Sequence, residues 1–311
     1  MAEYKSKILI IGSGPAGYTA GIYAARAGLN PILVSGTEVG GQLTLSEEVE
    51  NFPGFVSSSR GPELMEIIRK QALNLGVQMI NDKIVEVDFS KRPFVCSSEN
   101  HDVFCAESII IATGASARWL GIESEEKFRG FGVSVCATCD GFFYRGKDVA
   151  VIGGGNTAVE EALYLTNFAR SVTLVHRRDE LRAEAALQNK LRNNPQINIK
   201  YNSVVEEILG TDMPRNVEGI RLKDVKTDKT EVLKVDGVFV AIGHKPNTEI
   251  FARQLNLDDA GYIKTRPKSC ATSIEGVFAA GDVQDPEYRQ AVIAAGSGAM
   301  AAIEAGRFLS K

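Results

Sequence analysis

The sequence predicts an α/β protein made of two Rossmann-like domains, each with three layers around a central sheet. Three observations carry this prediction. A glycine-rich turn between a β-branched strand and a small-residue helix occurs twice, in residues 7–28 and 148–169. A hydrophobic strand that ends in glycine and a turn also occurs twice, in residues 108–120 and 237–248. The chain of 311 residues exceeds the size that one hydrophobic core usually organises, so two domains are expected.

The composition is that of an ordinary globular protein, with 44% hydrophobic and 24% charged residues. A formal net charge of -4 provides no positive field to attract a nucleic acid backbone. The N-terminal residues MAEYKSK lead directly into the first strand, without the apolar region of a signal peptide. No apolar run approaches the roughly 20 residues of a membrane-spanning helix. We therefore expect no nucleic acid partner, no membrane insertion and a cytoplasmic location.

The first glycine-rich turn has the spacing of a dinucleotide-binding motif. Residues 7–17 read KILIIGSGPAG and place Gly12, Gly14 and Gly17 in the pattern G-x-G-x-x-G between a strand and a helix. The first glycine permits the tight turn, the second lets the backbone approach a pyrophosphate, and the third lets the helix pack close to the strand. Free N–H groups at the helix N-terminus then bind the phosphates. A glycine-rich turn without a ligand is the alternative.

The second glycine-rich turn repeats the pattern. Residues 148–158 read DVAVIGGGNTA, with Gly153, Gly155 and Ala158 at the three positions, and alanine is an accepted third member. Two such units in one chain predict two bound dinucleotides. The most plausible use of two dinucleotides is the transfer of a hydride from one to the other, which is the task of a flavin paired with a nicotinamide.

Basic residues follow the next strand of the second unit. The strand SVTLV runs into His176, Arg177 and Arg178, and Arg182 follows shortly after. This position usually carries an acid for a ribose 2′-OH, whereas arginine accommodates a 2′-phosphate. Neighbouring guanidinium groups can bind a phosphate, so the site is predicted to prefer NADPH over NADH. A solvated basic turn is the alternative. In the first unit the corresponding strand ends at Ser35 and not at an acid, which makes that fingerprint imperfect.

Two cysteines, Cys136 and Cys139, lie two residues apart and are followed directly by Asp140. Their spacing alone leaves a metal site, an idle thiol pair and a redox disulfide open. Zinc needs four ligands, and the remaining cysteines and histidines are scattered, so no metal is expected. Five cysteines without a signal peptide indicate a reducing compartment, where a disulfide is more often catalytic than structural. Core packing is the expected role of the other cysteines and of the single tryptophan: Cys96, Cys105, Cys270 and Trp119.

The order of these motifs resembles that of the low-molecular-weight, bacterial-type thioredoxin reductases, which belong to the FAD- and NADPH-dependent pyridine nucleotide-disulfide oxidoreductases. The resemblance covers essentially the whole chain and includes the segments GGQL, EVENFPGF, CATCDG, HRRDELRAE, GVFAAGDV and YRQA. It implies a homodimeric flavoenzyme that uses NADPH to reduce the disulfide of thioredoxin through FAD and an internal cysteine pair. It also implies a discontinuous FAD domain, residues 1–116 and 246–311, with the NADPH domain, residues 117–245, inserted.

The resemblance also assigns the nucleotide contacts. FAD would lie against the first glycine turn and against later residues near its flavin and ribityl groups: Gly12, Ser13, Gly14, Pro15, Ala16, Gly17, Gln42, Asn51, Asp282, Arg289, Gln290 and Ala291. NADPH would lie against the second turn and the basic cluster: Gly153, Gly155, Asn156, Thr157, His176, Arg177, Arg178 and Arg182. Turn formation by Gln42 and Asn51, and helix capping by Asp282, are the alternatives.

By the same resemblance, Cys139 faces the flavin, Cys136 attacks the partner disulfide through a mixed disulfide, and Asp140 manages the thiol proton. A helix N-cap is the alternative for Asp140. Because the cysteines lie on the NADPH domain, this domain is expected to rotate between two poses, with hinges near Ala117 and Gly243.

Several other functions compete with this interpretation. Flavin-dependent reductases of ferredoxin or flavodoxin share the glycine motifs but lack the cysteine pair. A disulfide-forming oxidase would not need the arginines, and a nucleotide-sensing protein would not need the cysteines. The alternative function is an NADPH-dependent flavin reductase of another small disulfide protein or electron carrier.

Overall fold

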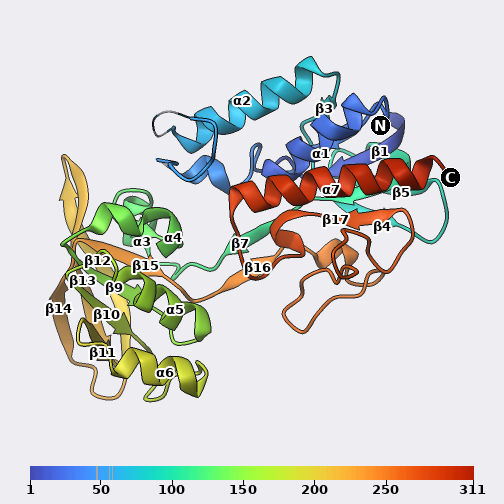
Figure 1. The fold of residues 1–311 in the computed structure, drawn as a ribbon. Coiled ribbons are helices and arrows are strands. Elements are labelled where there is room, and N and C mark those ends of the chain that lie inside the picture. The colour runs from blue at the N-terminus through green and yellow to red at the C-terminus, as the bar shows by residue number, and fades with distance from the viewer. Residues whose placement is uncertain (47, 56, 58) are drawn as a thin grey trace. The chain divides into compact units, whose positions relative to one another are not determined.

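A computed structural model describes residues 1–46, 48–55, 57 and 59–311. The chain forms two compact units (Figure 1). The first unit comprises residues 1–116 and 245–311, and the second comprises residues 117–244. The second unit is therefore an insertion in the sequence of the first.

The first unit is built on a sheet with the order β3-β2-β1-β6-β5-β4, and β17 also pairs with β6. Strands β1, β2, β3, β6 and β17 run parallel, whereas β4, β5 and β6 form an antiparallel meander. β-branched runs such as ILII and SIII form the central strands because both of their faces are buried. The strands are β1 (Glu3–Ile11), β2 (Ile32–Val34), β3 (Gln78–Ile80), β4 (Ile84–Asp88), β5 (Phe94–Ser98), β6 (Val103–Ile111) and β17 (Val277–Ala279).

Side chains alternate between the two faces of this sheet and form two separate cores. Ile8 and Ile10 face a core shared with the long helices, and Leu9 and Ile11 face a core shared with the segment after residue 245. The first unit thus has three layers. Its helices are α1 (Pro15–Arg26), α2 (Gly61–Asn74) and α7 (Ala291–Leu309), with short 3-10 turns η1 (Gln42–Leu45), η3 (Glu249–Phe251) and η4 (Gly281–Val283).

Helix α7 corrects one expectation from the sequence. It is 19 residues long, with a mean hydropathy of 1.2 over 18 residues, and is long and apolar enough by length and composition to cross a membrane. The expectation that no apolar run approaches this length was therefore wrong. Its apolar character serves packing inside the first unit, because small residues let it lie directly beside α1 (Figure 1). A Cβ on Gly298 would stand 2.1 Å from the carbonyl oxygen of Ala16.

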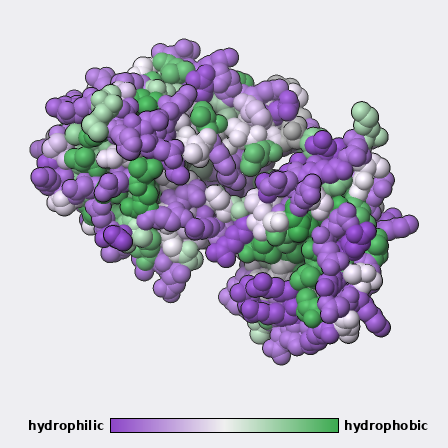
Figure 2. Space-filling model, turned by 180° about the vertical axis from the view of Figure 1, so that it is seen from behind, coloured by the Kyte–Doolittle hydropathy of each residue, from purple (hydrophilic) through white to green (hydrophobic). Residues whose placement is uncertain are grey.

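On the face drawn in Figure 2, hydrophobic residues form small groups among hydrophilic ones.

The second unit repeats the three-layer plan. Its parallel sheet has the order β11-β10-β9-β15-β8, and a separate antiparallel sheet has the order β12-β13-β14. The strands are β8 (Val133–Ser134), β9 (Asp148–Ile152), β10 (Ser171–Val175), β11 (Ile197–Lys200), β12 (Ser203–Asp212), β13 (Arg215–Asp224), β14 (Thr230–Lys234) and β15 (Gly237–Val240). The helices are α3 (Glu123–Phe128), α4 (Ala137–Asp140), α5 (Asn156–Leu165) and α6 (Ala185–Arg192), and η2 (Gly141–Tyr144) follows α4.

Alternation along β9 again separates two cores. Val149 and Val151 face a core shared with α5 and α6, while Ala150 and Ile152 face a core shared with the antiparallel sheet. The two remaining strands, β7 (Ala115–Ala117) and β16 (His244–Pro246), lie where the chain passes from one unit to the other, and they pair with each other. The predicted α/β class with two Rossmann-like, three-layer units is confirmed.

Candidate functional site

The first glycine turn is shaped by contacts that only glycine permits. Gly12 has a φ of +113°, and a Cβ there would stand 2.2 Å from the carbonyl oxygen of Ala112. A Cβ on Gly17 would stand 2.0 Å from the carbonyl oxygen of Gly12, so α1 begins directly against the turn. Gly14 differs, because a Cβ there would meet no atom within 4 Å. The structure thus leaves open space in front of the α1 N-terminus, where Gly14 is the cap residue and no side chain caps the helix.

This open N-terminus fits the pyrophosphate of a dinucleotide. Pro15 occupies the first turn of α1, where its missing N–H costs nothing, and no acidic residue lies in that turn to repel an anion. The uncapped N–H groups and the helix dipole favour negative charge at this end. Gly12, Gly14 and Gly17 are therefore arranged as the motif requires, and Ala16 packs behind them against α7.

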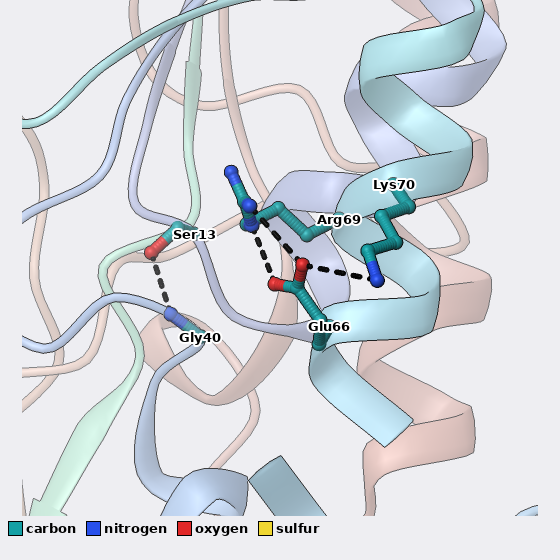
Figure 3. A network of polar contacts seen from close by, with 5 residues as sticks. All are labelled: Ser13, Gly40, Glu66, Arg69 and Lys70. Atoms are coloured by element: carbon teal, nitrogen blue, oxygen red, sulfur yellow. Dashed lines mark hydrogen bonds and ion pairs between the residues drawn. The ribbon is translucent and has the colours of Figure 1, made fainter. Parts of the chain in front are cut away.

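Ser13 uses its hydroxyl to shape the turn. Its Oγ donates to the carbonyl oxygen of Ser35 at 2.8 Å. The same Oγ accepts from the N–H of Gly40 at 3.0 Å (Figure 3). Ser13 is 2% exposed. The hydroxyl of Ser35, at the end of β2, donates to the neighbouring carbonyl of Gly36. Both hydroxyls are thus engaged within the protein, and Ser13 can offer a nucleotide chiefly its backbone.

Charges near this turn are paired on helix α2. Arg69 Nε lies 2.7 Å from Glu66 Oε2, and Lys70 Nζ lies 3.7 Å from Glu66 Oε1 (Figure 3). The hydrogen bond from Arg69 lowers the pKa of the Glu66 carboxyl and keeps it ionised. Glu66 therefore contacts both cations and offsets one of their two positive charges.

Two polar residues predicted beside the flavin come together from distant parts of the chain. The side-chain amide of Asn51 donates to Gln290 Oε1 at 3.2 Å, across 239 residues of sequence. Gln42, in contrast, donates to Glu38 Oε2 at 2.6 Å. Sequence reasoning missed Glu38, which is the acid beyond the end of β2. Its signal was weak, because it lies three positions after Ser35, where an acid was sought.

Asp282 lies in the turn η4, which contacts α7 through a hydrogen bond of 2.8 Å from the N–H of Gly281 to Ser297 Oγ. Burial raises the pKa of its carboxyl to about 6, with a smaller contribution from the charge of Asp285, while Arg289 opposes the shift. The cap residue of η4 is Ala280, and no side chain caps the turn, so Asp282 is not a helix cap. Arg289 has a positive φ of 50° and directly precedes Gln290, the N-cap of α7, which begins at Ala291. These residues form one continuous segment at the end of the helix.

The glycine turn of the second unit has the same design. A Cβ on Gly153 would stand 2.4 Å from the carbonyl oxygen of Ala241 and 2.6 Å from the Cβ of Ala158, so the third motif position packs on the first. A Cβ on Gly155 would meet no atom within 4 Å, and α5 begins there without a side-chain cap or an acid in its first turn. Thr157 lies in that turn, half-buried. This helix N-terminus also fits a pyrophosphate.

The adjacent Asn156 is held by a neighbouring segment. Its Oδ1 accepts from the N–H of Glu184 at 2.9 Å, and its Nδ2 donates to Glu184 Oε1 at 3.2 Å. This reciprocal pair fastens the start of α5 to the start of α6. The role of Glu184 was not foreseen from the sequence, because its partner lies 28 residues away.

The basic cluster separates into one buried and three exposed residues. His176 is 5% exposed, and its ring lies against Gly154, where a Cβ would stand 2.2 Å from Nδ1. Burial lowers the pKa of His176, and Nε2 lies 3.0 Å from the carbonyl oxygen of Glu180. The imidazole therefore supports the glycine turn from behind. The three arginines, which are all exposed, are Arg177, Arg178 and Arg182.

The arginine cluster is tied to the glycine turn through the backbone. The N–H of Arg182 donates to the carbonyl oxygen of Gly154 at 2.7 Å. Within the described part of the chain, no salt bridge is formed by Arg177, Arg178 or Arg182. Their charges thus remain available to an anion at this edge of the parallel sheet.

Cys136 and Cys139 are joined in a disulfide, with Cα atoms 5.3 Å apart. Cys136 is the N-cap residue of α4, and its carbonyl oxygen accepts from the N–H groups of Cys139 and Asp140 at 3.2 and 3.1 Å. The Sγ of Cys136 lies 3.3 Å from the hydroxyl of Thr138. Cys139 is exposed and Cys136 is half-buried. The spacing left a metal site, an idle thiol pair and a disulfide open, and the structure shows a disulfide.

Asp140 follows the disulfide at the end of α4. Burial raises the pKa of its carboxyl, and a hydrogen bond with the hydroxyl of Ser134 opposes the shift. It also precedes η2, where its side chain forms no cap hydrogen bond. A carboxyl beside a disulfide that holds its proton more tightly than usual is a candidate proton donor to the sulfurs. Sequence reasoning missed Ser134, which gives no motif of its own.

The remaining cysteines are free thiols: Cys96, Cys105 and Cys270. Cys96 and Cys270 are buried, and burial raises the pKa of each to about 12. Their thiols stay protonated and unreactive at neutral pH. Trp119 lies in the second unit, where the guanidinium of Arg129 stacks 3.9 Å from its ring centroid.

Comparisons with known proteins agree with this arrangement. The profile of the pyridine nucleotide-disulphide oxidoreductase family matches residues 6–298. A thioredoxin reductase of Rickettsia bellii is 58% identical over 306 residues, covering 98% of this chain and 99% of that one. A thioredoxin reductase of Escherichia coli O157:H7 is 54% identical and covers 98% of this chain and 96% of that one. The solved thioredoxin reductase of Giardia duodenalis superposes with a TM-score of 0.95 at 43% identity, covering 99% and 100% of the two chains.

These findings confirm the resemblance that the motifs indicated. The family match spans both glycine turns and the disulfide, and the relatives are alike along nearly the full length of the chain. The chain belongs to the pyridine nucleotide-disulphide oxidoreductase family.

Proposed function

We propose that this protein is an NADPH-dependent thioredoxin-disulfide reductase that holds FAD on its first unit and NADPH on its second. The observation that carries the proposal is the Cys136–Cys139 disulfide in the same unit as an open dinucleotide turn. The names of the relatives support thioredoxin as the disulfide substrate.

The first unit would hold FAD at the N-terminus of α1. Gly12, Gly14 and Gly17 supply the turn, and uncapped N–H groups meet the pyrophosphate. The Asn51–Gln290 pair and the segment from Asp282 to Ala291 would line the flavin end. When bound, FAD supplies a centre that accepts a hydride from NADPH and passes two electrons to the disulfide.

The second unit would hold NADPH at the N-terminus of α5. Gly155 leaves room for the pyrophosphate, while His176 and Gly153 fix the turn from behind. Arg177 and Arg178 carry exposed charges where the 2′-phosphate of NADPH is expected. The proposal assigns the preference for NADPH over NADH to these two residues.

The disulfide would relay electrons to the partner. Reduction adds two electrons and one proton to Cys136–Cys139 and leaves one thiol and one thiolate. Asp140, whose pKa is raised by burial, supplies that proton. The thiolate of Cys136 then attacks one sulfur of oxidised thioredoxin to form a mixed disulfide, and Cys139 displaces the reduced partner and restores the internal disulfide.

The working form is proposed to be a homodimer in the cytoplasm. Cytosolic proteins keep their thiols reduced, and the three cysteines outside the disulfide are free thiols, which supports this location. Rotation of the second unit about the segments near Ala117 and Gly243 would present NADPH and the disulfide to the flavin in turn. Gly243 has a φ of +105° and lies beside β16, which makes its backbone the natural place for a change of direction.

The test measures NADPH oxidation by the purified protein with and without oxidised thioredoxin. Thioredoxin should stimulate oxidation in the wild type and have no effect in Cys136→Ser or Cys139→Ser. Cys270→Ser is the matched control, because it removes a thiol outside the relay, and it should keep full activity. Bleaching of the flavin by NADPH should persist in all variants.

Two results would overturn the proposal. If NADPH fails to bleach a bound flavin in the wild type, the assignment of the two nucleotides is wrong. If the flavin is bleached but thioredoxin has no effect, the electron acceptor is another small disulfide protein or electron carrier.

A further inference from the structure

Lys226 lies in the turn between β13 and β14, and its side chain reaches the arginine loop of the second unit, which comprises residues 176–182. Its Nζ lies 2.9 Å from Oδ2 of Asp179, a residue 47 positions earlier in the sequence. Asp179 directly follows Arg177 and Arg178, whose exposed charges are proposed to bind the 2′-phosphate of NADPH. The arginine loop therefore carries a carboxylate at the edge of a site for an anion.

The backbone fastens the β13–β14 turn to the arginine loop. The N–H of Asn202 donates to the carbonyl oxygen of Arg178 at 3.1 Å. The N–H of Val225 donates in turn to the carbonyl oxygen of Asn202 at 2.7 Å. Within the turn, Oδ1 of Asp224 accepts from the N–H of Lys226 at 2.9 Å. Lys226 thus extends from a backbone position that is held next to the arginine loop.

An unpaired carboxylate at position 179 would act against the phosphate site. The charges in this loop act on one another: burial is the main cause of the lowered pKa of His176, and the charges of Arg182 and Arg178 lower it further. A free Asp179 would either pair with Arg178, its neighbour in the chain, or stay unpaired and repel the phosphate. Both arrangements offset a positive charge that the phosphate needs. In the structure, the hydrogen bond from Lys226 lowers the pKa of the Asp179 carboxyl and keeps it ionised and engaged elsewhere.

We propose that Lys226 is a positioning residue for the selection of NADPH. Its ammonium holds the Asp179 carboxylate, so that Arg177 and Arg178 keep their charges for the 2′-phosphate. Lys226 acts through Asp179 and does not itself contact the cofactor. This inference rests on the proposed function and deepens it, because it concerns how the second unit distinguishes NADPH from NADH.

The ion pair can be removed without harm to the fold. The side chains of Lys226 and Asp179 are 58% and 67% exposed. An exposed ion pair of this kind contributes little to the free energy of unfolding. A change in cofactor binding after its removal therefore reports on charge at the site, and urea unfolding of each variant verifies that the fold is unchanged.

The experiment measures the binding of NADP⁺ and of NAD⁺ to the flavin-loaded enzyme by isothermal titration calorimetry. Both cofactors are oxidised, so no hydride passes to the flavin, and they differ only in the 2′-phosphate. Each titration is carried out at low and at high ionic strength. The wild type should bind NADP⁺ more tightly than NAD⁺, and more so at low ionic strength.

Lys226→Met should weaken the binding of NADP⁺ about fivefold at low ionic strength, because the released carboxylate of Asp179 offsets one positive charge. The binding of NAD⁺ should not change, since this cofactor lacks the 2′-phosphate. The loss should shrink at high ionic strength, because salt screens exposed charges. A merely structural defect would instead weaken both cofactors at every ionic strength.

A rescue variant and a matched control isolate the role of Asp179. The double variant Lys226→Met with Asp179→Asn should regain the wild-type affinity for NADP⁺, because no carboxylate is left to release. Lys223→Met removes the same charge from the same hairpin and breaks a 2.8 Å ion pair with Asp228, which lies outside the arginine loop. This control should keep the wild-type affinity for NADP⁺.

Three results would overturn the inference: wild-type affinity for NADP⁺ in Lys226→Met, an equal loss in Lys223→Met, or a double variant that stays as weak as Lys226→Met. The last result would mean that Lys226 binds the phosphate itself. Failure of the proposed function is seen separately, in the wild type. If the wild type does not prefer NADP⁺ to NAD⁺, the assignment of NADPH is wrong and this inference is lost with it. If that preference is present and the variants fail as stated, only the role of Lys226 is wrong.

Discussion

The side-chain amide of Asn51 donates a hydrogen bond of 3.2 Å to Gln290, a residue 239 positions later in the sequence. Asn51 follows the 3-10 turn η1, and Gln290 is the N-cap of α7. The pair joins the two sequence segments that form the first unit, on either side of the inserted second unit. Both residues were expected beside the flavin, and their contact allows this expectation to be tested through FAD binding.

We predict that Asn51→Ala and Gln290→Ala each weaken FAD binding, and that their effects are not additive. A hydrogen bond between neutral side chains contributes about 1 kcal/mol, so the coupling energy in a double-mutant cycle should be of that size. Titration of the flavin-free protein with FAD, followed by flavin fluorescence, gives the dissociation constants. Gln71→Ala, at an exposed position of α2, serves as control. Strict additivity would show that the pair does not act together on the flavin.

A motif glycine that faces open space and one that packs against backbone should respond differently to replacement by alanine. Gly155→Ala introduces a methyl group into open space and should change the free energy of unfolding by less than about 1 kcal/mol. It should still weaken NADPH binding, by about tenfold or more, because the methyl occupies the place of the pyrophosphate. Gly17→Ala places a methyl 2.0 Å from a carbonyl oxygen and should destabilise the protein by about 2 kcal/mol. Urea unfolding and cofactor titration separate the two effects.

Arg177 and Arg178 should determine the choice of nicotinamide cofactor. Their joint replacement by alanine should lower kcat/KM for NADPH by about a hundredfold, since each charged hydrogen bond to a phosphate contributes about 1.5 kcal/mol. The value for NADH should change little, because that cofactor lacks the 2′-phosphate. Arg192→Ala, an exposed arginine on α6, is the control. An unchanged ratio of the two kcat/KM values would reject the assignment.

Asp282 should make the stability of the flavin-free protein depend on pH. Burial raises its folded-state pKa to about 6, above the unfolded value of about 3.9. The folded protein therefore binds the proton more tightly, and this contribution to stability is fully present below about pH 4 and is lost as pH rises to about 6. Asp282→Asn should remove that loss and raise the free energy of unfolding at pH 7.5 by about 2 kcal/mol relative to the wild type. The exposed Asp259→Asn should show no such gain in urea unfolding.

The sequence predicted the fold because its strongest signals are local. A β-branched strand, a G-x-G-x-x-G turn and a small-residue helix follow one another directly, and each glycine role at Gly12, Gly14 and Gly17 is visible in the contacts. The apolar strands of the parallel sheets are likewise buried on both faces. The antiparallel sheet β12-β13-β14 was not foreseen, because its strands mix buried and exposed charged residues and carry no motif.

Parts of the site could not be predicted because they depend on contacts between distant segments. The hydroxyl of Ser13 is used by Ser35 and Gly40, and the ring of His176 lies behind Gly154. A motif marks these residues as near a nucleotide but cannot tell a supporting side chain from a contacting one. Ser134 carries no signature at all, and its position becomes apparent only when β8 and α4 are seen together.

The insertion of residues 117–244 has a consequence for how the protein is made on the ribosome. The second unit is one uninterrupted segment, so it can complete its fold as soon as it leaves the exit tunnel. The first unit begins earlier but must wait for the last residues, because β17 pairs with β6 and the small residues of α7 complete its core. We therefore expect the inserted unit to reach its native state before the unit that surrounds it, a reversal of the usual N-terminal-first order of synthesis. Until α7 emerges, only α1 and α2 cover the helical face of the first sheet, and this is the interval in which a nascent chain most needs a chaperone.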